Sequence, residues 1–222
     1  MQHDGGRKGT DCVKSPPTLS RRSQRGLDWF VFFVADVQTG FGAFVAVYLT
    51  AEKWTQVDIG LVLTVGGLVG LAAQIPGGAL IDAARSIRWA AATAIIAIGA
   101  SAFALAAWPI FVVAIASRVA QAIASSILSP ALAAISLALV GQEAIGERLG
   151  RNASFASVGT GLAAAGMGAC GYYLSNQAVF FVAAAMVFPA LIALFQISER
   201  EIDPSRAHGW APSRTDSEIL PG

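Results

Sequence analysis

Six apolar stretches, each long enough to cross a lipid bilayer, follow one another between residues 27 and 197. A helix needs roughly 20 apolar residues to cross a hydrocarbon core about 30 Å thick, because each residue adds about 1.5 Å. We therefore predict an all-α membrane protein with six transmembrane helices. The fourth stretch is the longest, and we expect it to kink or to leave the hydrocarbon at Ser129–Pro130. The predicted spans are 27–50, 59–81, 89–107, 110–140, 155–174 and 178–197.

The composition agrees with a chain that is surrounded by lipid. Hydrophobic residues make up 55% of the sequence and charged residues only 13%, whereas a soluble domain carries about 25% charged residues. Too little polar surface remains to solvate six buried helices. Cys12 and Cys170 support neither a disulfide framework nor a metal site.

The basic residues predict the orientation of the chain. Of the fifteen Lys and Arg residues, thirteen lie on one side if the N-terminus is cytoplasmic; Lys53 alone lies outside, and Arg118 lies within a span. Loops that face the cytoplasm carry the excess of Lys and Arg. We therefore expect a multi-pass protein of the cell (inner) membrane with both termini in the cytoplasm. Residues 1–26 are predicted to be a disordered basic tail, and residues 198–222 a polar tail.

Polar residues inside the predicted spans are the first functional candidates. Asp36 and Gln38 lie in the first span, and Arg118 and Gln121 lie in the fourth. A charge at mid-bilayer costs about 2.5–3.5 kcal/mol, so such side chains usually face a wet cavity or a partner. By helical rise, Asp36 lies about 14 Å and Arg118 roughly 18 Å from the inner boundary. We expect the two to be partners, directly or through water, or to serve substrate binding and proton coupling.

The fourth span also carries a polar stripe. Arg118, Gln121, Ser125 and Ser129 recur at i, i+3, i+7 and i+11, which places them on one helical face. Such a stripe predicts the lining of an aqueous path, with a hydrogen-bonded seam between helices as the alternative. Gln38 points away from Asp36 on its helix, so at most one of the two is expected to face the cavity fully.

The sequence does not favour an enzyme. Both histidines, His3 and His208, lie in the tails, and Asp36 is the one carboxylate well inside a span. Acid–base, metal and intramembrane protease chemistry therefore lack their usual groups. The chain has no G-x-x-x-x-G-K-[ST] phosphate loop. We expect no cofactor, no metal and no nucleic acid, and the lipid bilayer and a small solute as partners.

Three short segments resemble motifs of the major facilitator superfamily. Residues 78–88 are similar to the loop signature G-x-L-a-D-r-x-G-r-r: Gly78, Leu80 and Asp82 match it, Arg85 stands where the signature has its second glycine, and Arg88 supplies a basic residue slightly out of register. Residues 117–122 resemble the element R-x-x-q-G, with alanine in place of the glycine. The resemblance covers about residues 25–200.

The third segment follows the fourth predicted span. Glu147, Arg148, Gly150 and Arg151 resemble the family segment E-R-x-G-R, which precedes the fifth helix. We expect these residues in the loop between spans four and five.

The resemblance implies an N-terminal six-helix bundle built from two inverted three-helix repeats. Asp82, Arg85 and Arg88 would form a cytoplasmic latch with Gly78, and Arg118 would lie in a central cavity. The implied function is transport of a small solute by alternating access, secondary and coupled to protons if Asp36 titrates. The charged tail at 198–222 resembles the start of the central linker, so a second bundle is expected beyond it.

Two alternatives stay open. The chain could be a truncated or half-size protein that is inactive alone. It could also work as a homodimer or with a second six-helix half. The cavity candidates, Asp36, Gln38, Arg118, Gln121 and Ser125, suit a polar, an amphiphilic or a cationic solute equally well.

Overall fold

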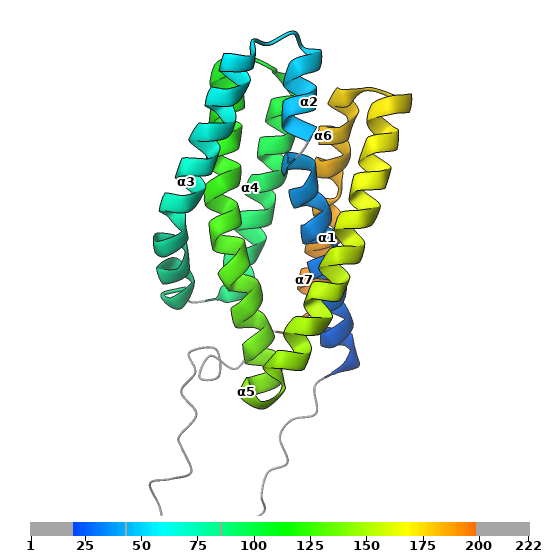
Figure 1. The fold of residues 1–222 in the computed structure, drawn as a ribbon. Helices are drawn as coiled ribbons and strands as arrows, with labels where there is room; N and C mark the ends of the chain where they lie inside the picture. The colour runs from blue at the N-terminus through cyan, green and yellow to red at the C-terminus, as the bar shows by residue number, and fades with distance from the viewer. Residues whose placement is uncertain (1–19, 43, 85, 199–222) are drawn as a thin grey trace, which may run out of the picture.

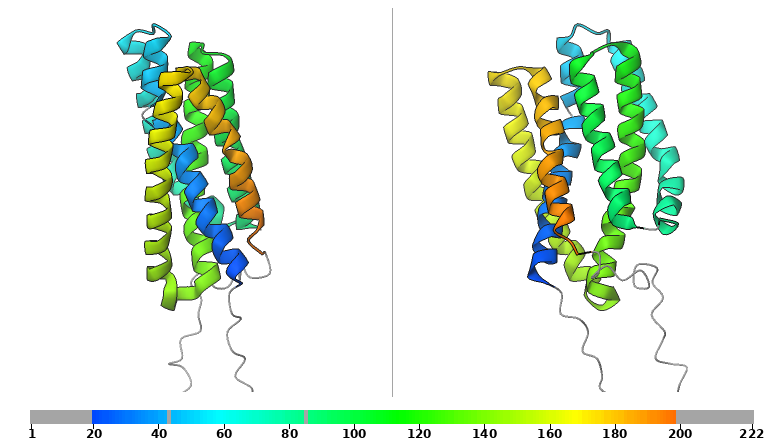
Figure 2. Two further views of the ribbon diagram at one scale, coloured as in Figure 1. Left: turned by 90° about the vertical axis from the view of Figure 1, so that its right-hand side faces the viewer. Right: turned by 180° about the vertical axis from the view of Figure 1, so that it is seen from behind.

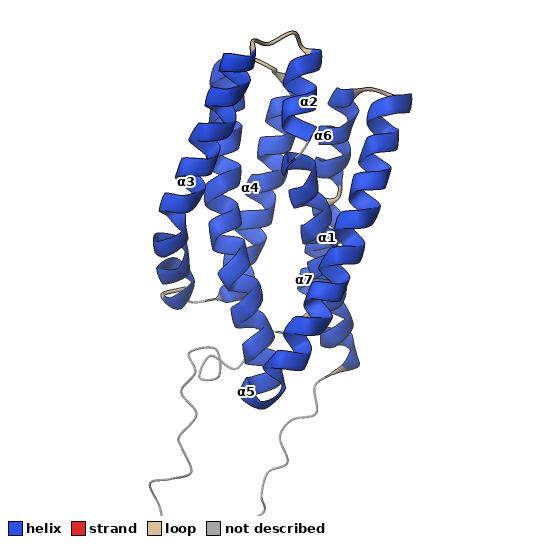
Figure 3. Ribbon diagram, in the orientation of Figure 1, coloured by secondary structure: helices blue, strands red, loops and turns tan. Residues whose placement is uncertain are grey.

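The computed structural model of the protein describes residues 20–42, 44–84 and 86–198, and every regular element within these ranges is a helix. Figure 1 shows the helices side by side in one bundle, and Figure 3 shows short loops between them. The prediction of an all-α fold is thus confirmed for the described part of the chain. The predicted tails lie outside the described residues, apart from 20–26 and Ser198.

Seven helices follow one another in the described ranges, and five helical stretches are long and apolar enough to cross a membrane. Two of these stretches combine neighbouring helices, α1 with α2 and α6 with α7. The structure therefore gives five candidate spans where the sequence predicted six, because the predicted fourth and fifth spans belong to one helical element. The helices are α1 Arg21–Gly42, α2 Phe44–Ala51, α3 Gln56–Asp82, α4 Ile87–Ala107, α5 Phe111–Tyr173, α6 Asn176–Ala185 and α7 Val187–Phe195.

Helix α5 is a hairpin of two helical arms. Its backbone leaves helical geometry at Gly141, where φ is 74° and ψ is 176°. Glycine adopts this conformation readily because it has no Cβ. Figures 1 and 2 show α5 running along the bundle, turning, and running back. We call residues 111–140 the first arm and residues 142–173 the second arm.

This hairpin corrects one expectation from the sequence. The segment 141–154, expected to be a loop, is helical except at Gly141. The kink or exit from the hydrocarbon expected at Ser129–Pro130 stays a prediction, since helical backbone continues through Pro130 without a break. Proline removes one N–H and so one helical hydrogen bond, whereas Gly141 holds a positive φ that reverses the chain.

Pro130 is accommodated by a glycine on a neighbouring helix. The carbonyl of Ser126, four residues before the proline, cannot accept the usual helical hydrogen bond. Gly77 of α3 lies directly against this carbonyl, because a Cβ at position 77 would be 2.7 Å from the Ser126 oxygen. The absence of a side chain at Gly77 lets α3 and the first arm approach closely.

The predicted sixth span, 178–197, is divided where a proline follows. Helix α6 ends at Ala185, and α7 begins at Val187 after a turn at Met186. Pro189 lacks the N–H that would bond the carbonyl of Ala185, and its ring crowds that carbonyl. The chain keeps its direction, because Ala190 N still donates to Met186 O at 3.2 Å.

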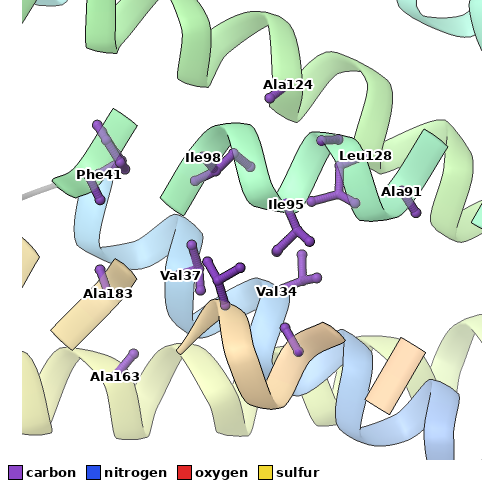
Figure 4. Packing of buried hydrophobic residues seen from close by; sticks show 14 of the residues in the cluster. Val34, Val37, Phe41, Ala91, Ile95, Ile98, Ala124, Leu128, Ala163 and Ala183 are labelled. Atoms are coloured by element: carbon purple, nitrogen blue, oxygen red, sulfur yellow. The ribbon is translucent and has the colours of Figure 1, made fainter. Parts of the chain in front are cut away.

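The hydrophobic core is formed mainly by α1, α4, α6, α7 and the two arms of α5, and α2 and α3 add fewer buried residues to it. In Figure 4, Val34 of α1 faces Ile95 of α4, and Leu128 of the first arm lies beside Ile95. In the most apolar part of α4, 56% is buried inside the protein, compared with 17% in the corresponding part of α3. Helix α4 is therefore central, and α3 is a peripheral helix that packs on the first arm.

The start of α1, the reversal of α5 and the end of α7 lie at the same end of the bundle (Figures 1 and 2). Ser198 N donates to Ser23 Oγ at 3.2 Å and so joins the residues after α7 to the start of α1. We call this the turn end of the bundle. The opposite end carries the connections from α2 to α3, from α4 to α5 and from α5 to α6.

Candidate functional site

The centre of the candidate site is Arg118, near the start of the first arm of α5. Its Nη1 group donates to the carbonyl of Phe41 at 2.9 Å and to Oε1 of Gln121 at 3.1 Å. Phe41 lies near the C-terminal end of α1. The guanidinium group therefore joins α1 to α5.

The polar stripe predicted from the sequence continues from Arg118 as a chain of hydrogen bonds. Gln121 Nε2 donates to Ser125 Oγ at 3.1 Å, and Ser129 Oγ donates to the Ser125 carbonyl at 3.3 Å. All of these bonds join residues of the first arm to one another. They fix the side chains along one face of the arm without binding a second helix.

Helix α3 covers Arg118 with a glycine. A Cβ at Gly66 would lie 3.1 Å from Arg118 Nε and 3.5 Å from Nη2, so even an alanine there would push the guanidinium aside slightly. Nε is buried and has no hydrogen-bond acceptor among the described residues. Arg118 is thus packed closely but is not fully satisfied by the described part of the chain.

A groove of about 500 Å³ runs between α3 and the first arm, beginning at Gly66. Its volume falls within the range of roughly 300–1,000 Å³ that is usual for ligand pockets. The groove exists because α3 presents glycines to it rather than side chains: no atom lies within 4 Å of an added Cβ at Gly67 or Gly78. Its polar lining consists of Gln74, Ser125, Ser126 and Ser129.

Asp36 and Gln38 lie on α1, and both are partly buried. Neither forms a hydrogen bond or an ion pair with another described residue. The direct pair expected between Asp36 and Arg118 is therefore not formed, because Arg118 bonds Phe41 and Gln121 instead. Similar depth in a membrane does not make two residues neighbours, since their helices can turn them to different sides.

The residues of the expected latch divide between the groove and the turn end. Gly78 lines the groove, Asp82 is the exposed last residue of α3, and Arg85 lies outside the described residues. Arg88 Nη1 donates to the carbonyl of Ile197 at 2.7 Å, and its guanidinium lies 5.3 Å from the ring centre of Phe195. Arg88 therefore fastens the start of α4 to the end of α7.

The segment that resembles E-R-x-G-R lies at the start of the second arm. Glu147 and Gly150 are exposed, whereas Arg148 and Arg151 both bind the carboxylate of Asp28 on α1. Asp28 belongs to no motif that could be recognised in the sequence. An acidic residue just inside the predicted first span was the one available signal, and its partners could not be inferred from it.

Within the described ranges, no group of three or more His, Cys, Asp or Glu side chains could hold a metal ion. The groups gathered around Arg118 are one guanidinium, one amide, hydroxyls and backbone carbonyls. This set can bind a polar solute or water by hydrogen bonds, and it offers no nucleophile with an adjacent base.

The five apolar helical stretches and the polar residues within them define a multi-pass membrane protein. The family model of the Major Facilitator Superfamily matches residues 29–216, which is most of the chain. The chain therefore belongs to this superfamily, as the motifs in the sequence predicted.

Two relatives come from Mycobacterium tuberculosis, one from strain CDC 1551 / Oshkosh and one from strain ATCC 25618 / H37Rv. Both are described as uncharacterized MFS-type transporters. Each is 36% identical to this chain over 201 residues, and the match covers 89% of this chain but 46% of the relative. The chain thus spans about half the length of the curated relatives it matches.

Proposed function

We propose that this chain is one six-helix bundle of a secondary transporter that moves a small solute by alternating access. The six spans are obtained by counting the two arms of α5 separately, which the reversal at Gly141 supports. The two inverted repeats would be α1–α2, α3 and α4, and then the first arm, the second arm and α6–α7. The protein would lie in the inner membrane. The excess of Lys and Arg at the turn end supports a cytoplasmic position for that end and for both termini.

The observation that carries this proposal is the hydrogen-bonded stripe from Arg118 to Ser125 beside the groove. A guanidinium in mid-membrane costs about 2.5–3.5 kcal/mol, so it needs a polar surrounding. One bond of this stripe, from Arg118 to the Phe41 carbonyl, joins two helices. The remaining bonds lie within the first arm. Hydrogen bonds within one helix do not hold two helices together, so they do not favour a seam between helices. They do fix polar side chains along one face, as the wall of a solute path requires.

Asp36 is the proposed coupling residue. Its carboxylate is partly buried on α1 and has no partner among the described residues, so it is available to take up and release a proton. Moving one elementary charge across 100 mV is worth about 2.3 kcal/mol, which is enough to drive modest accumulation of a solute.

We further propose that the working transporter contains a second six-helix half. The relatives are about twice as long as the matched segment, which supports this proposal. The second half could be further chain, a separate protein or a second copy of this bundle. A half-size protein that is inactive alone is the competing interpretation.

The proposal can be tested in proteoliposomes that contain the pH-sensitive dye pyranine. The chain would be reconstituted alone and as a fusion to the part of the H37Rv relative that lies outside the match. Both samples would be screened with sugars, amino acids, organic acids and organic cations. A solute-dependent proton signal in the fusion alone supports a required second half. A signal in both samples supports activity of this chain or its homodimer, and no signal in either would count against proton-coupled transport.

A further inference from the structure

The carboxylate of Asp28 on α1 binds two arginines from the second arm of α5. Arg148 Nη2 lies 2.6 Å from Oδ1, and Arg151 Nη2 lies 2.6 Å from Oδ2. Arg151 Nε also donates to both oxygens at 3.1 Å. Asp28 therefore accepts four hydrogen bonds, and two parallel N–H groups of Arg151 bind it as a fork, the strongest geometry for this pair.

The three charges differ in exposure. Asp28 is 2% exposed and Arg148 is 6% exposed, whereas the side chain of Arg151 is 52% exposed. A buried arginine that loses its carboxylate is left as an uncompensated charge, which is far more costly than loss of an exposed partner. Separating Asp28 from Arg148 would therefore be costly, because both are buried. Arg151 is the solvent-exposed member of the cluster.

A second bond fastens the same helix face to the first arm. Asn152 Nδ2 donates to Ser136 Oγ at 2.8 Å, and both residues are buried. Ser136 Oγ in turn donates to the Leu132 carbonyl at 2.8 Å, which fixes the hydroxyl. Asn152 lies four residues after Arg148, so the two side chains share one face of the second arm.

From this geometry we infer that Asp28, Arg148, Arg151, Asn152 and Ser136 form an internal clamp, which sets the position of the second arm against α1 and against the first arm. The clamp lies near the Gly141 reversal, where the backbone alone would leave the angle between the arms free. The segment that resembles E-R-x-G-R thus serves the geometry of this bundle. This inference does not depend on transport.

The competing interpretation is that Arg148 and Arg151 are gate charges, which exchange partners with another bundle. The burial of Arg148 opposes it, because its release from Asp28 would leave a buried cation. The exposed members of the segment, Glu147 and Gly150, remain able to contact another surface and make no bond to Asp28.

The first test is thermal unfolding of the purified full chain in detergent. We expect Asp28→Asn to lower the midpoint by about 10 °C, because it strands a buried arginine. Arg151→Gln should lower it by less than half as much, since Arg148 keeps its partner. Glu147→Gln is the matched control from the same segment and should leave the midpoint unchanged. Equal shifts for Asp28→Asn and Glu147→Gln would overturn the inference.

The double variant Asp28→Asn/Arg148→Met keeps the test decisive if Asp28→Asn does not fold. Removing both buried charges leaves no uncompensated partner, so the double variant should fold and unfold at a higher temperature than Asp28→Asn. A double variant that also fails to fold, or that is less stable than a folded Asp28→Asn, would contradict a clamp formed by this pair.

Amide hydrogen exchange separates a clamp from general destabilisation. Asp28→Asn should speed exchange in residues 21–30 and 142–155, while the exchange of α3 stays as in the parent protein. A uniform increase that includes α3 would show that the carboxylate supports the whole bundle rather than the position of the second arm.

Discussion

Arg118 Nη1 and the Phe41 carbonyl lie 2.9 Å apart, and this bond joins the first arm of α5 to α1. One side chain thereby connects α1 with the polar stripe that runs to Ser125. The arrangement places a permanent positive charge beside the groove that α3 and the first arm enclose.

We predict that Arg118→Ala abolishes the solute-dependent pyranine signal, because it removes the charge and the donor that orients Gln121. Arg118→Lys should keep part of the signal, since an ammonium group retains the charge but cannot make both bonds in the same geometry. Gln177→Ala is a suitable control, because Gln177 bonds the Ala106 carbonyl outside the groove. An Arg118→Ala variant that transports at the parental rate would contradict the proposed role.

The groove offers a steric test that leaves the polar residues intact. An added Cβ at Gly67 meets no atom within 4 Å, so Gly67→Leu should fold normally while its side chain fills the groove. We expect the pyranine signal to be lost and the unfolding midpoint to be kept.

Gly60→Leu is the matched control for this variant. Gly60 is equally open on the same helix but does not line the groove. Loss of the signal in both variants would show that α3 cannot accept leucine anywhere, and the groove would then have no special role.

Asp36→Asn tests proton coupling. The variant should still bind solute, but its transport should no longer depend on the pH gradient, because an amide cannot take up a proton. The measurement is uptake at a series of external pH values, with Gln38→Ala on the same helix as the control. An Asp36→Asn variant with the parental pH dependence would remove Asp36 from the coupling mechanism.

The reversal of α5 gives a prediction about stability. Gly141 has φ 74° and ψ 176°, a region that is almost restricted to glycine. Gly141→Ala should therefore lower the free energy of unfolding by about 1–3 kcal/mol. Gly146→Ala, five residues further along a helix and open to added atoms, should be neutral or slightly stabilising. Equal stability of the two variants would mean that the reversal tolerates other residues.

The sequence predicted those features that depend on one helix alone. The stripe from Arg118 to Ser125 follows from spacing, because residues at i, i+3 and i+7 share a face whatever surrounds the helix. The apolar stretches likewise predicted helices of the right length. The Phe41 carbonyl could not be predicted as the partner of Arg118, since every residue carries a backbone carbonyl and the sequence does not distinguish one from another.

Features that depend on two helices were predicted less well. The sequence-based depths of Asp36 and Arg118 are similar, but depth does not specify which way a helix is turned about its axis. Asp28 belongs to no motif, and its two arginines lie more than a hundred residues away along the chain. A kink or an exit from the hydrocarbon was expected at Ser129–Pro130 because proline is the usual helix breaker, whereas the backbone leaves helical geometry at Gly141, which no pattern in the sequence marked.

The contact between Gly77 and the Ser126 carbonyl has a consequence for how this part of the sequence can evolve. Pro130 leaves that carbonyl without its helical donor, and a Cβ at position 77 would lie 2.7 Å from its oxygen. The two positions are thus expected to change together among relatives. A lineage that replaces the proline restores the helical bond to the carbonyl and becomes free to carry alanine in place of the glycine, whereas alanine arriving first would meet the bare oxygen.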